Sequence, residues 1–187
     1  MLHPNFRTDY DHYQGCPLAP LELIEYGDFQ CEHCAEVYPV IKWLEDAFGD
    51  RLKFVYRHFP VPTRHPLSLQ AAVAAEAAAI QGKFWYMHDM IFENQKYLTQ
   101  SSLSEFAREI DLDMRSFEDC REHRKLFRKV ISDFEGGVKS GVDGSPTFFI
   151  NGIRYDGFGD FDHLYSALQN WNQCEYYTTE RPTGNLR

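Results

Sequence analysis

The fold is decided by residues 21–59, which read LELIEYGDFQCEHCAEVYPVIKWLEDAFGDRLKFVYRHF. Residues 21–26 are a short, largely apolar run, which is typical of a strand. From Cys31 the apolar side chains recur at helical spacing until Gly49, a residue suited to the left-handed position that ends a helix. Residues 52–59 predict a second strand. Strand, helix and strand form a βαβ unit, so we expect two parallel strands with a right-handed crossover.

The segment after this unit, residues 66–140, shows no strand-like alternation and predicts an all-helical insertion with at least four helices. We expect them over residues 66–82, over residues 84–95, from the capping box Ser102-Leu103-Ser104-Glu105, and from Asp113 to Gly141 with a break.

The last part of the chain predicts a hairpin and a helix. Residues 147–155, TFFINGIRY, spell two short strands around Asn-Gly, the pair favoured in two-residue type I′ turns. A final amphipathic helix is expected near residues 164–171, and the polar residues 172–187 predict a flexible tail. The order βαβ, helical insertion, ββα predicts an α/β fold in a single domain over residues 1–187.

The composition disfavours several classes of function. The chain has 19 Lys plus Arg against 28 Asp plus Glu, a net charge of −9. Proteins that bind a phosphate backbone concentrate basic charge, so we expect no nucleic acid as a partner. No segment reaches the roughly 18 consecutive apolar residues that a spanning helix needs, so we expect no membrane partner. The first twenty residues lack the apolar region of a secretory signal, which favours a cytoplasmic location, or a periplasmic one if a leader has been removed.

The chain has five cysteines, an odd number that cannot pair completely within one chain. Two of them, in Cys31-Glu32-His33-Cys34, lie where the first strand leads into the helix. The free amides and dipole at a helix amino terminus stabilise a thiolate, so we expect Cys31 to be an exposed nucleophile with a lowered pKa. Cys34 is expected to face inward and to attack a mixed disulfide formed on Cys31. His33 favours the thiolate and Glu32 opposes it, which predicts an intermediate redox poise.

The chain resembles the thioredoxin-fold proteins, and within them the DsbA-like group with a helical insertion. The resemblance covers about residues 21–171 and rests on three features, namely Cys31-Glu32-His33-Cys34, Ser145-Pro146-Thr147 and the surrounding segment 141–152. It implies a thioredoxin-like fold and a thiol:disulfide oxidoreductase that exchanges disulfides with other polypeptides and has a redox recycling partner. Cys31 and Cys34 would then be the redox-active disulfide, so no metal and no organic cofactor is expected.

By the same resemblance, Ser145 and Pro146 form the cis-proline loop of the family. Pro146 is expected to face Cys31, and Ser145 to present its backbone to an extended substrate chain. The alternative is an ordinary trans-proline that opens a strand.

Glu25 lies six residues before Cys31, where the family often places an acid beneath the active site. A carboxyl group on a buried strand is costly unless it has a task. We expect burial to raise the pKa of Glu25, so that it takes or returns the proton of Cys34. Glu22, on the same strand, is expected to be solvated. Pro39 matches the kink proline in the active-site helix of thioredoxin.

Three other functions stay open. One is a zinc-binding protein that joins Cys31 and Cys34 to a pair such as Cys120 and His123. Another is a chaperone-like binding protein on the same fold, whose aromatic run at residues 84–92 would hold unfolded chains, although its helical spacing favours packing. The third is a glutathione-dependent transferase or isomerase.

Four further side chains have no assigned chemistry. Cys16 and Cys174 lie outside any motif and either pair or are free. His58 and His65 flank a proline-rich break and are expected to line the cleft.

Overall fold

The structure, a computed structural model, describes residues 2–178 and the side chains of residues 2–171. Its strands are β1 (His12–Gly15), β2 (Leu21–Gly27), β3 (Leu52–His58), β4 (Thr147–Ile150) and β5 (Ile153–Tyr155). Its α-helices are α1 (Glu32–Phe48), α2 (Ser68–Ala79), α3 (Phe84–Glu93), α4 (Gln100–Glu109), α5 (Met114–Arg121), α6 (Arg124–Lys139) and α7 (Phe161–Thr178). Short 3₁₀ helices are η1 (Gly49–Arg51) and η2 (Gln95–Tyr97).

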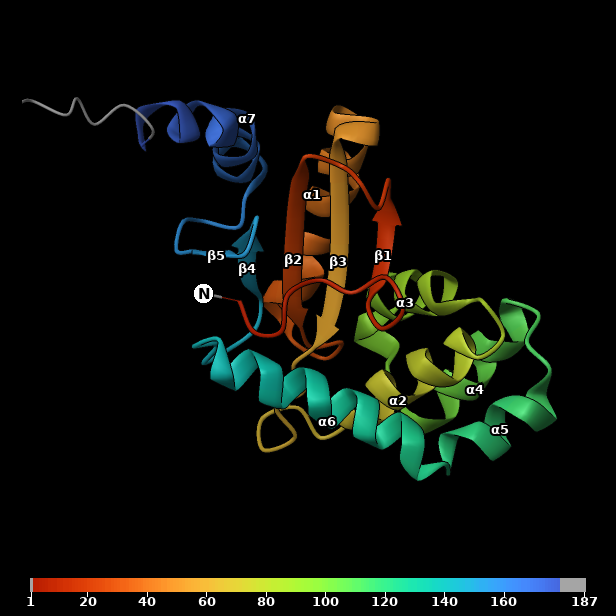
Figure 1. Cartoon of the computed structure of the whole chain (residues 1–187). Coiled ribbons are helices and arrows are strands. Elements are labelled where there is room, and N and C mark those ends of the chain that lie inside the picture. Colours follow the sequence, from red (N-terminus) through yellow and green to blue (C-terminus); the bar gives the residue numbers. More distant parts are fainter. Residues whose placement is uncertain (1, 179–187) are drawn as a thin grey trace, which may run out of the picture.

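The strands form one five-stranded sheet in the order β1-β3-β2-β4-β5 (Figure 1). Strand β2 pairs parallel with β3 and antiparallel with β4, while β1 and β5 are antiparallel edge strands. The expected parallel βαβ unit is therefore confirmed, with α1 as its crossover. The α/β order of βαβ, helical insertion and ββα is also confirmed.

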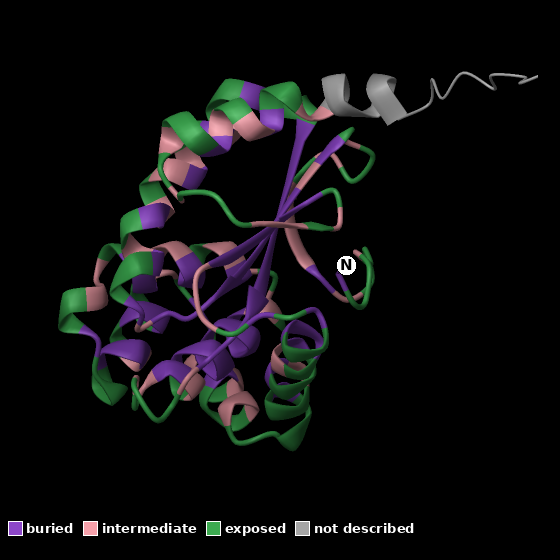
Figure 2. Ribbon diagram, turned by 90° about the vertical axis from the view of Figure 1, so that its left-hand side faces the viewer, coloured by how far each residue is buried: buried purple, intermediate pink, exposed green. Residues whose placement is uncertain are grey.

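Each face of the sheet packs against its own helices (Figure 1). Successive side chains of a strand point to opposite faces, so Leu23 packs with α1 and the insertion, whereas Ile24 and Tyr26 pack on the other face. Helix α6 and the first residues of the chain cover that second face. Figure 2 shows the buried strands enclosed by helices whose outer sides are exposed. Strand β2, buried on both faces, ends at the loop that leads into α1.

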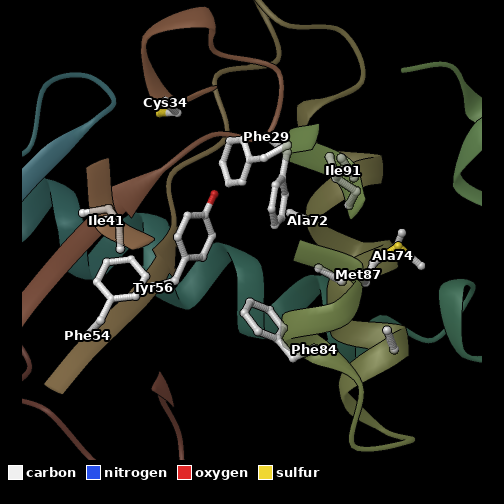
Figure 3. Close-up of a cluster of buried hydrophobic side chains, with 14 of the residues drawn as sticks. Phe29, Cys34, Ile41, Phe54, Tyr56, Ala72, Ala74, Phe84, Met87 and Ile91 are labelled. Carbon is white, nitrogen blue, oxygen red and sulfur yellow. The ribbon is translucent and has the colours of Figure 1, made fainter. Parts of the chain in front are cut away.

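The helical insertion shares one core with the sheet. Figure 3 shows Phe29 and Tyr56 beside the α3 side chains Phe84, Met87 and Ile91, and all five are buried. Helix α2 is mostly alanine and almost completely buried, so its small side chains allow neighbouring helices to approach closely. The insertion is consequently held to the sheet by a continuous apolar contact.

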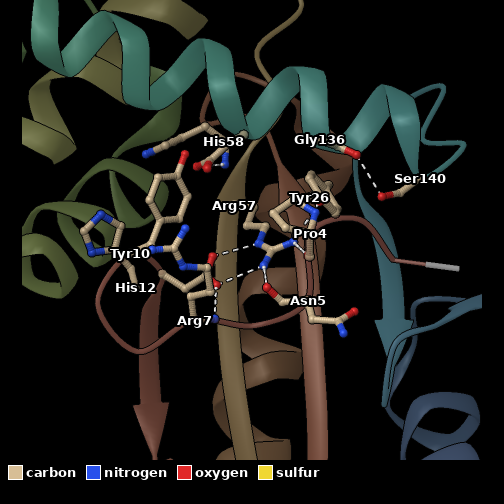
Figure 4. A network of polar contacts seen from close by, with 12 residues as sticks. Pro4, Asn5, Arg7, Tyr10, His12, Tyr26, Arg57, His58, Gly136 and Ser140 are labelled. Atoms are coloured by element: carbon tan, nitrogen blue, oxygen red, sulfur yellow. Dashed lines mark hydrogen bonds and ion pairs between the residues drawn. The ribbon is translucent and has the colours of Figure 1, made fainter.

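A buried ion pair fixes the start of the chain over the sheet (Figure 4). The Arg57 side chain is only 1 % exposed and contacts both carboxylate oxygens of Asp11, at 2.7 and 2.9 Å. It also donates to the hydroxyl of Tyr26 at 3.0 Å and to the carbonyl of Pro4 at 2.8 Å. Because a buried charge is costly when unpaired, these partners are needed for Arg57 to occupy this face.

Strand β1 is an element that the sequence pattern does not predict. Its four residues, HYQG, are only partly buried and pair with β3 alone. A short edge strand has one paired side and little apolar alternation, so it carries no clear hydrophobic signal.

Two boundaries also differ from the prediction. The cap of α4 is Thr99, whose hydroxyl accepts from the amide of Ser102 at 3.0 Å, so Ser102 is the last residue of the capping box rather than its first. Residues 172–178, predicted as part of the tail, are helical and extend α7 to Thr178. No Gly or Pro interrupts this segment, and polarity alone does not end a helix. Residues 179–187 lie outside the described part of the chain.

The hairpin between β4 and β5 is confirmed. Asn151 and Gly152 both have positive φ, at 45° and 79°, as a type I′ turn requires. Gly49, at the end of α1, also has a positive φ of 51°.

The packing of α6 on the sheet gives a stability prediction. A Cβ added at Gly137 would lie 2.9 Å from Phe59 and 3.0 Å from Tyr26. We expect Gly137→Ala to lower the free energy of unfolding by about 1–3 kcal/mol through overpacking. Urea unfolding of the reduced protein measures this loss. Gly144→Ala, where an added Cβ meets nothing within 4 Å, is the matched control; equal losses in the two variants would contradict the packing account.

Candidate active site

Cys31 is the cap residue of α1, at the carboxyl end of β2. Its amide donates to the carbonyl of Asp28 at 3.0 Å, which closes the loop, and its own carbonyl accepts from the amide of Ala35 at 3.2 Å. The thiol lies at the helix amino terminus, where the amides of His33 and Cys34 have no partner within the helix. Cys31 is only 6 % exposed, so the prediction of an exposed nucleophile is wrong. The loop that contains Ser145 contacts the thiol and covers it.

The electrostatics around Cys31 favour its thiolate. The hydrogen bond with the thiol of Cys34 is the largest cause that lowers the pKa of Cys31, to about 5, and burial opposes it. A hydrogen bond with Ser145 and the amides of Cys34 and His33 lower this pKa further. This pKa of about 5 is below the ordinary value of about 8.5 for a cysteine and also below neutral pH. The thiolate is therefore the favoured form of Cys31 at neutral pH.

Cys34 has the opposite character. It is 1 % exposed, lies one helical turn after Cys31, and accepts a hydrogen bond from the amide of Asp28 at 3.5 Å. Burial raises the pKa of Cys34 well above its ordinary value, and the hydrogen bond with Cys31 and the charge of Glu25 add to the effect. The motif therefore presents one thiolate and one protonated thiol.

Glu25 lies on β2 between Tyr56 of β3 and Phe148 of β4, and it is 3 % exposed. It lines a small internal cavity together with Cys34. Among the described residues its Oε1 has no hydrogen-bond partner. Burial raises the pKa of Glu25 to about 8, and the negative charge of Cys31 contributes. A carboxyl group of this kind can hold or accept a proton near neutral pH.

The loop before β4 comes close to Cys31 from a distant part of the sequence. The Ser145–Pro146 peptide bond is cis, and in the thiol form Cys31 Sγ donates to the carbonyl of Ser145 at 3.3 Å. A surface hollow lies directly beside this loop, lined by Pro146, Phe148 and Tyr155 among others. The structure thus brings Cys31 and the Ser145–Pro146 peptide together.

His33 does not contact either sulfur. Its ring is 77 % exposed, and its Nδ1 lies 2.9 Å from a carboxylate oxygen of Glu36. The hydrogen bond and charge of Glu36 raise the pKa of His33, and the charge of Cys31 adds to this effect. His33 therefore supports the thiolate through its amide and through charge rather than by direct contact of the ring.

Three side chains hold the active-site loop; sequence reasoning named His65 for the cleft but missed Asp28 and Gln95. The Asp28 carboxylate accepts from the amides of Gln30 and Val61, both at 2.9 Å, and hydrogen-bonds with His65 at 2.8 Å. Gln95, from η2, donates to the carbonyl of Cys31 at 2.8 Å. Asp28 follows a strand next to a reactive motif, which is a usable signal, whereas Gln95 comes from the insertion and carries none.

The remaining candidates lie elsewhere. His58 is fully buried and pairs with Glu76, so the prediction that it lines the cleft is wrong. Burial is possible because each of these two polar side chains is the hydrogen-bond partner of the other. Among the side chains of residues 2–171, no cysteine belongs to a group of three potential metal ligands. Cys16 and Cys120 are partly buried free thiols, and the side chain of Cys174 lies outside the described range.

The aromatic run of α3 is mostly core, as its spacing predicts. Phe84 and Met87 are buried, whereas Tyr86 is exposed. No helix within residues 2–178 is both long and apolar enough to cross a membrane.

Comparison with protein families gives one matching model, described as thioredoxin, over residues 7–170. Two similar curated proteins are named Na⁺/H⁺ antiporter NhaA 1. The one from Mycolicibacterium vanbaalenii is 40% identical over 171 residues, which are 90% of this chain and 28% of that protein. The one from Salinispora arenicola is 38% identical over 160 residues, which are 86% of this chain and 24% of that protein. The chain thus spans about a quarter of the length of these relatives.

Solved structures show the same fold. The crystal structure of Wolbachia pipientis α-DsbA1 has a TM-score of 0.79 at 20% identity, over 94% of this chain and 98% of that one. Oxidised BdbD from Bacillus subtilis has a TM-score of 0.78 at 20% identity, over 88% and 94%. A thioredoxin-like oxidoreductase from Silicibacter pomeroyi has a TM-score of 0.76 at 23% identity, over 88% and 93%. The chain therefore belongs to the thioredoxin family and has the fold of its DsbA-like members.

Proposed function

We propose that this protein is a thiol:disulfide oxidoreductase that exchanges disulfides with the cysteines of other polypeptides. One observation carries the proposal, namely the opposite character of the two thiols at the start of α1. Cys31 has a pKa of about 5, while Cys34 behind it is buried and protonated. A ready nucleophile with a resolving thiol one turn away is the arrangement that disulfide exchange needs. The relatives named Na⁺/H⁺ antiporter are more than three times as long as this chain, so their activity is not transferred to it.

The exchange runs in two steps. In substrate reduction, the Cys31 thiolate attacks one sulfur of a substrate disulfide, the substrate S–S bond breaks, and the other substrate sulfur leaves as a thiolate. Cys34 then loses its proton and attacks the Cys31 sulfur, which releases the second substrate thiolate. The two electrons have passed to the substrate, and Cys31 and Cys34 form a disulfide. Substrate oxidation is the same sequence in reverse.

Glu25 is the proton acceptor that we infer for the second step. Cys34 cannot attack as a thiol, and its burial disfavours the thiolate. Glu25 lines the same cavity and has a pKa of about 8, so it can take the proton as Cys34 attacks and return it in the reverse direction.

Ser145 and Pro146 are the substrate-binding residues in this proposal. The Ser145 carbonyl that accepts from the Cys31 thiol becomes free when Cys31 is a thiolate or is joined to a substrate sulfur. An amide of an extended substrate chain can then donate to it. The hollow beside Pro146 can receive a neighbouring substrate side chain.

The pKa of Cys31 indicates the reduction potential of the Cys31–Cys34 pair. A Cys31 pKa of about 5 lies between the values of about 7 for thioredoxin and about 3.5 for DsbA. A stabilised thiolate stabilises the reduced form, so an intermediate reduction potential is supported. A redox recycling partner is required for turnover in either direction. The cytoplasmic location stays a prediction.

Replacing the resolving thiol tests the proposal directly. We expect reduced Cys34→Ser to stop after the first step with oxidised insulin, so that turnover falls at least about a hundredfold and a covalent adduct accumulates. Non-reducing gels and mass spectrometry before and after dithiothreitol measure the adduct. Cys31→Ser should give neither turnover nor adduct, and Cys120→Ser should behave like the wild type. Full turnover by Cys34→Ser would contradict the proposal and favour a glutathione-dependent route.

The pKa of Cys31 gives a pH prediction. Alkylation of Cys31 in the reduced protein should have a midpoint at about pH 5. Because this pKa is lowered on folding, the thiolate stabilises the reduced fold fully above the unfolded pKa of about 8.5, and the contribution is lost as the pH falls through about 5. Site-resolved mass spectrometry with iodoacetamide measures the midpoint. Cys34→Ala removes the main hydrogen bond and should raise the midpoint; an ordinary midpoint in the wild type would contradict the site described.

Replacement of Glu25 tests the proton transfer. In single-turnover experiments, resolution of the mixed disulfide by the wild type should become faster with pH as the Glu25 carboxylate forms. The inflection should lie below about 8, because Cys31 carries no charge in the mixed disulfide and so no longer raises the pKa of Glu25. Glu25→Gln should lose this inflection and slow resolution roughly tenfold to a hundredfold near neutral pH. Glu22→Gln is the matched control, since Glu22 lies on the same strand and pairs with Lys53 at 2.8 Å. An unchanged rate and profile in Glu25→Gln would rule out the transfer.

A further inference from the structure

Two imidazoles and a carboxylate converge at the junction of the sheet and the insertion, away from the two cysteines. Nε2 of His12 and Nε2 of His58 each lie 2.8 Å from the same oxygen, Oε1 of Glu76. These three potential ligand atoms are all within 4.8 Å of one another. Figure 4 labels His12 and His58 on neighbouring strands.

The fold explains why they converge. His12 of β1 lies opposite Tyr56 of β3, so His58, two residues further along β3, is on the same face of the sheet. Glu76 lies on α2, which packs over that face. The ring of Phe84 stacks on His12 with centroids 3.6 Å apart and restricts its orientation. The three side chains therefore come from three different elements.

Burial leaves access from one side. His58 is fully buried and Glu76 is 5 % exposed, whereas the side chain of His12 is 18 % exposed. Water can therefore reach the cluster beside His12, while its other sides are enclosed by protein. Such a site has protein ligands with restricted positions.

The charges around the cluster favour an added cation. Lys129 lies 3.9 Å from Glu76 but only 2.6 Å from Asp133, which also accepts from the amide of His58. Apart from the two imidazoles, the cluster holds one ammonium and two carboxylates, a net charge of −1. Burial opposes ionisation of Glu76, but hydrogen bonds with His12 and His58 hold its pKa well below the ordinary value. A buried net charge of this kind is stabilised by a counter-charge.

We propose that His12, His58 and Glu76 bind one zinc ion, with water completing its coordination on the side of His12. Imidazole nitrogens and a carboxylate oxygen are established zinc ligands. Tetrahedral bonds of about 2.0–2.1 Å separate ligand atoms by about 3.3 Å, so the two 2.8 Å contacts need to open by about 0.5 Å. The two Nε2 atoms, which lie within 4.8 Å of each other, need to reach the same spacing. The ion would join β1, β3 and α2 and so fasten the insertion to the sheet. This inference does not depend on the proposed redox function.

The hydrogen bonds that the metal ligands make to other groups affect the affinity of the site for zinc. Metal-bound imidazoles usually donate their second ring nitrogen to a partner. Within the described residues, the buried Nδ1 of His58 has no such partner. We therefore expect weaker binding than at a zinc site with a complete outer shell, but binding that depends on all three ligands.

The experiment uses the full chain with cysteine ligation blocked. Cys31 and Cys34 are oxidised to the disulfide, the other thiols are alkylated, and metal is removed with a chelator. Co²⁺ is titrated as a spectroscopic probe and is then displaced by Zn²⁺. We expect one ion per chain, d–d bands without thiolate charge-transfer bands, and first shifts at the His12 and His58 ring protons in NMR spectra.

Ligand variants decide the assignment. His12→Asn and the nearly isosteric Glu76→Gln should each weaken binding at least about tenfold. His163→Asn is the matched control, because His163 also pairs with an acid, Asp160, at 2.8 Å but is exposed. Zn²⁺ should raise the melting temperature of the wild type and of His163→Asn, but not that of the ligand variants. No binding by the wild type up to about 1 mM Zn²⁺, or equal binding by His12→Asn and Glu76→Gln, would overturn the proposal.

Discussion

The buried carboxylate of Asp28 is the interaction on which the active site depends. It accepts from the amides of Gln30 and Val61 and hydrogen-bonds with His65, while the backbone of the same residue contacts both cysteines. Hydrogen bonds to charged groups contribute about 1.5–3 kcal/mol each, and a buried carboxylate without them would be strongly destabilising. Asp28 therefore joins the end of β2, the start of α1 and the segment before α2. These bonds hold the loop in which Cys31 Sγ lies 3.3 Å from the carbonyl of Ser145.

The face of the sheet that packs against α1 and the insertion carries apolar side chains of the core and also an ionisable side chain of the candidate active site. Leu23 and Phe54 pack in the core, but Glu25, two residues further along β2, is an acid with no partner for Oε1 among the described residues. The low polarity that disfavours ionised Glu25 and Cys34 also strengthens the effect of the Cys31 charge on both groups. The difference between the two thiols thus comes from position. Cys31 accepts a hydrogen bond from Cys34 and meets free helix amides, whereas Cys34 is buried behind it.

The sequence predicted correctly those features that depend on residues close together in the chain. The βαβ unit, the Asn151-Gly152 turn and the position of Cys31 at a helix start depend on nearby residues, and each is present. The approach of Ser145 to Cys31, 114 positions away, came from resemblance and not from periodicity. Strand β1 and the contacts of Gln95 had no signal, because an edge strand needs little apolar alternation and an amide partner is chosen by tertiary structure. The exposure of Cys31 was mispredicted for the same reason, since the chain that covers it is distant in sequence.

The insertion has a direct effect on the reactive sulfur through these distant contacts. Apolar packing between α3 and the sheet is non-directional and would permit small shifts of one against the other. Polar contacts are directional, and Gln95 donates to the carbonyls of both Phe29 and Cys31 while Gln30 accepts from the amide of Leu67. A shift of the insertion would break these bonds and move the backbone whose amides stabilise the thiolate. The docking of the insertion and the pKa of Cys31 are therefore coupled, so a change that loosens this junction affects redox chemistry without touching either cysteine.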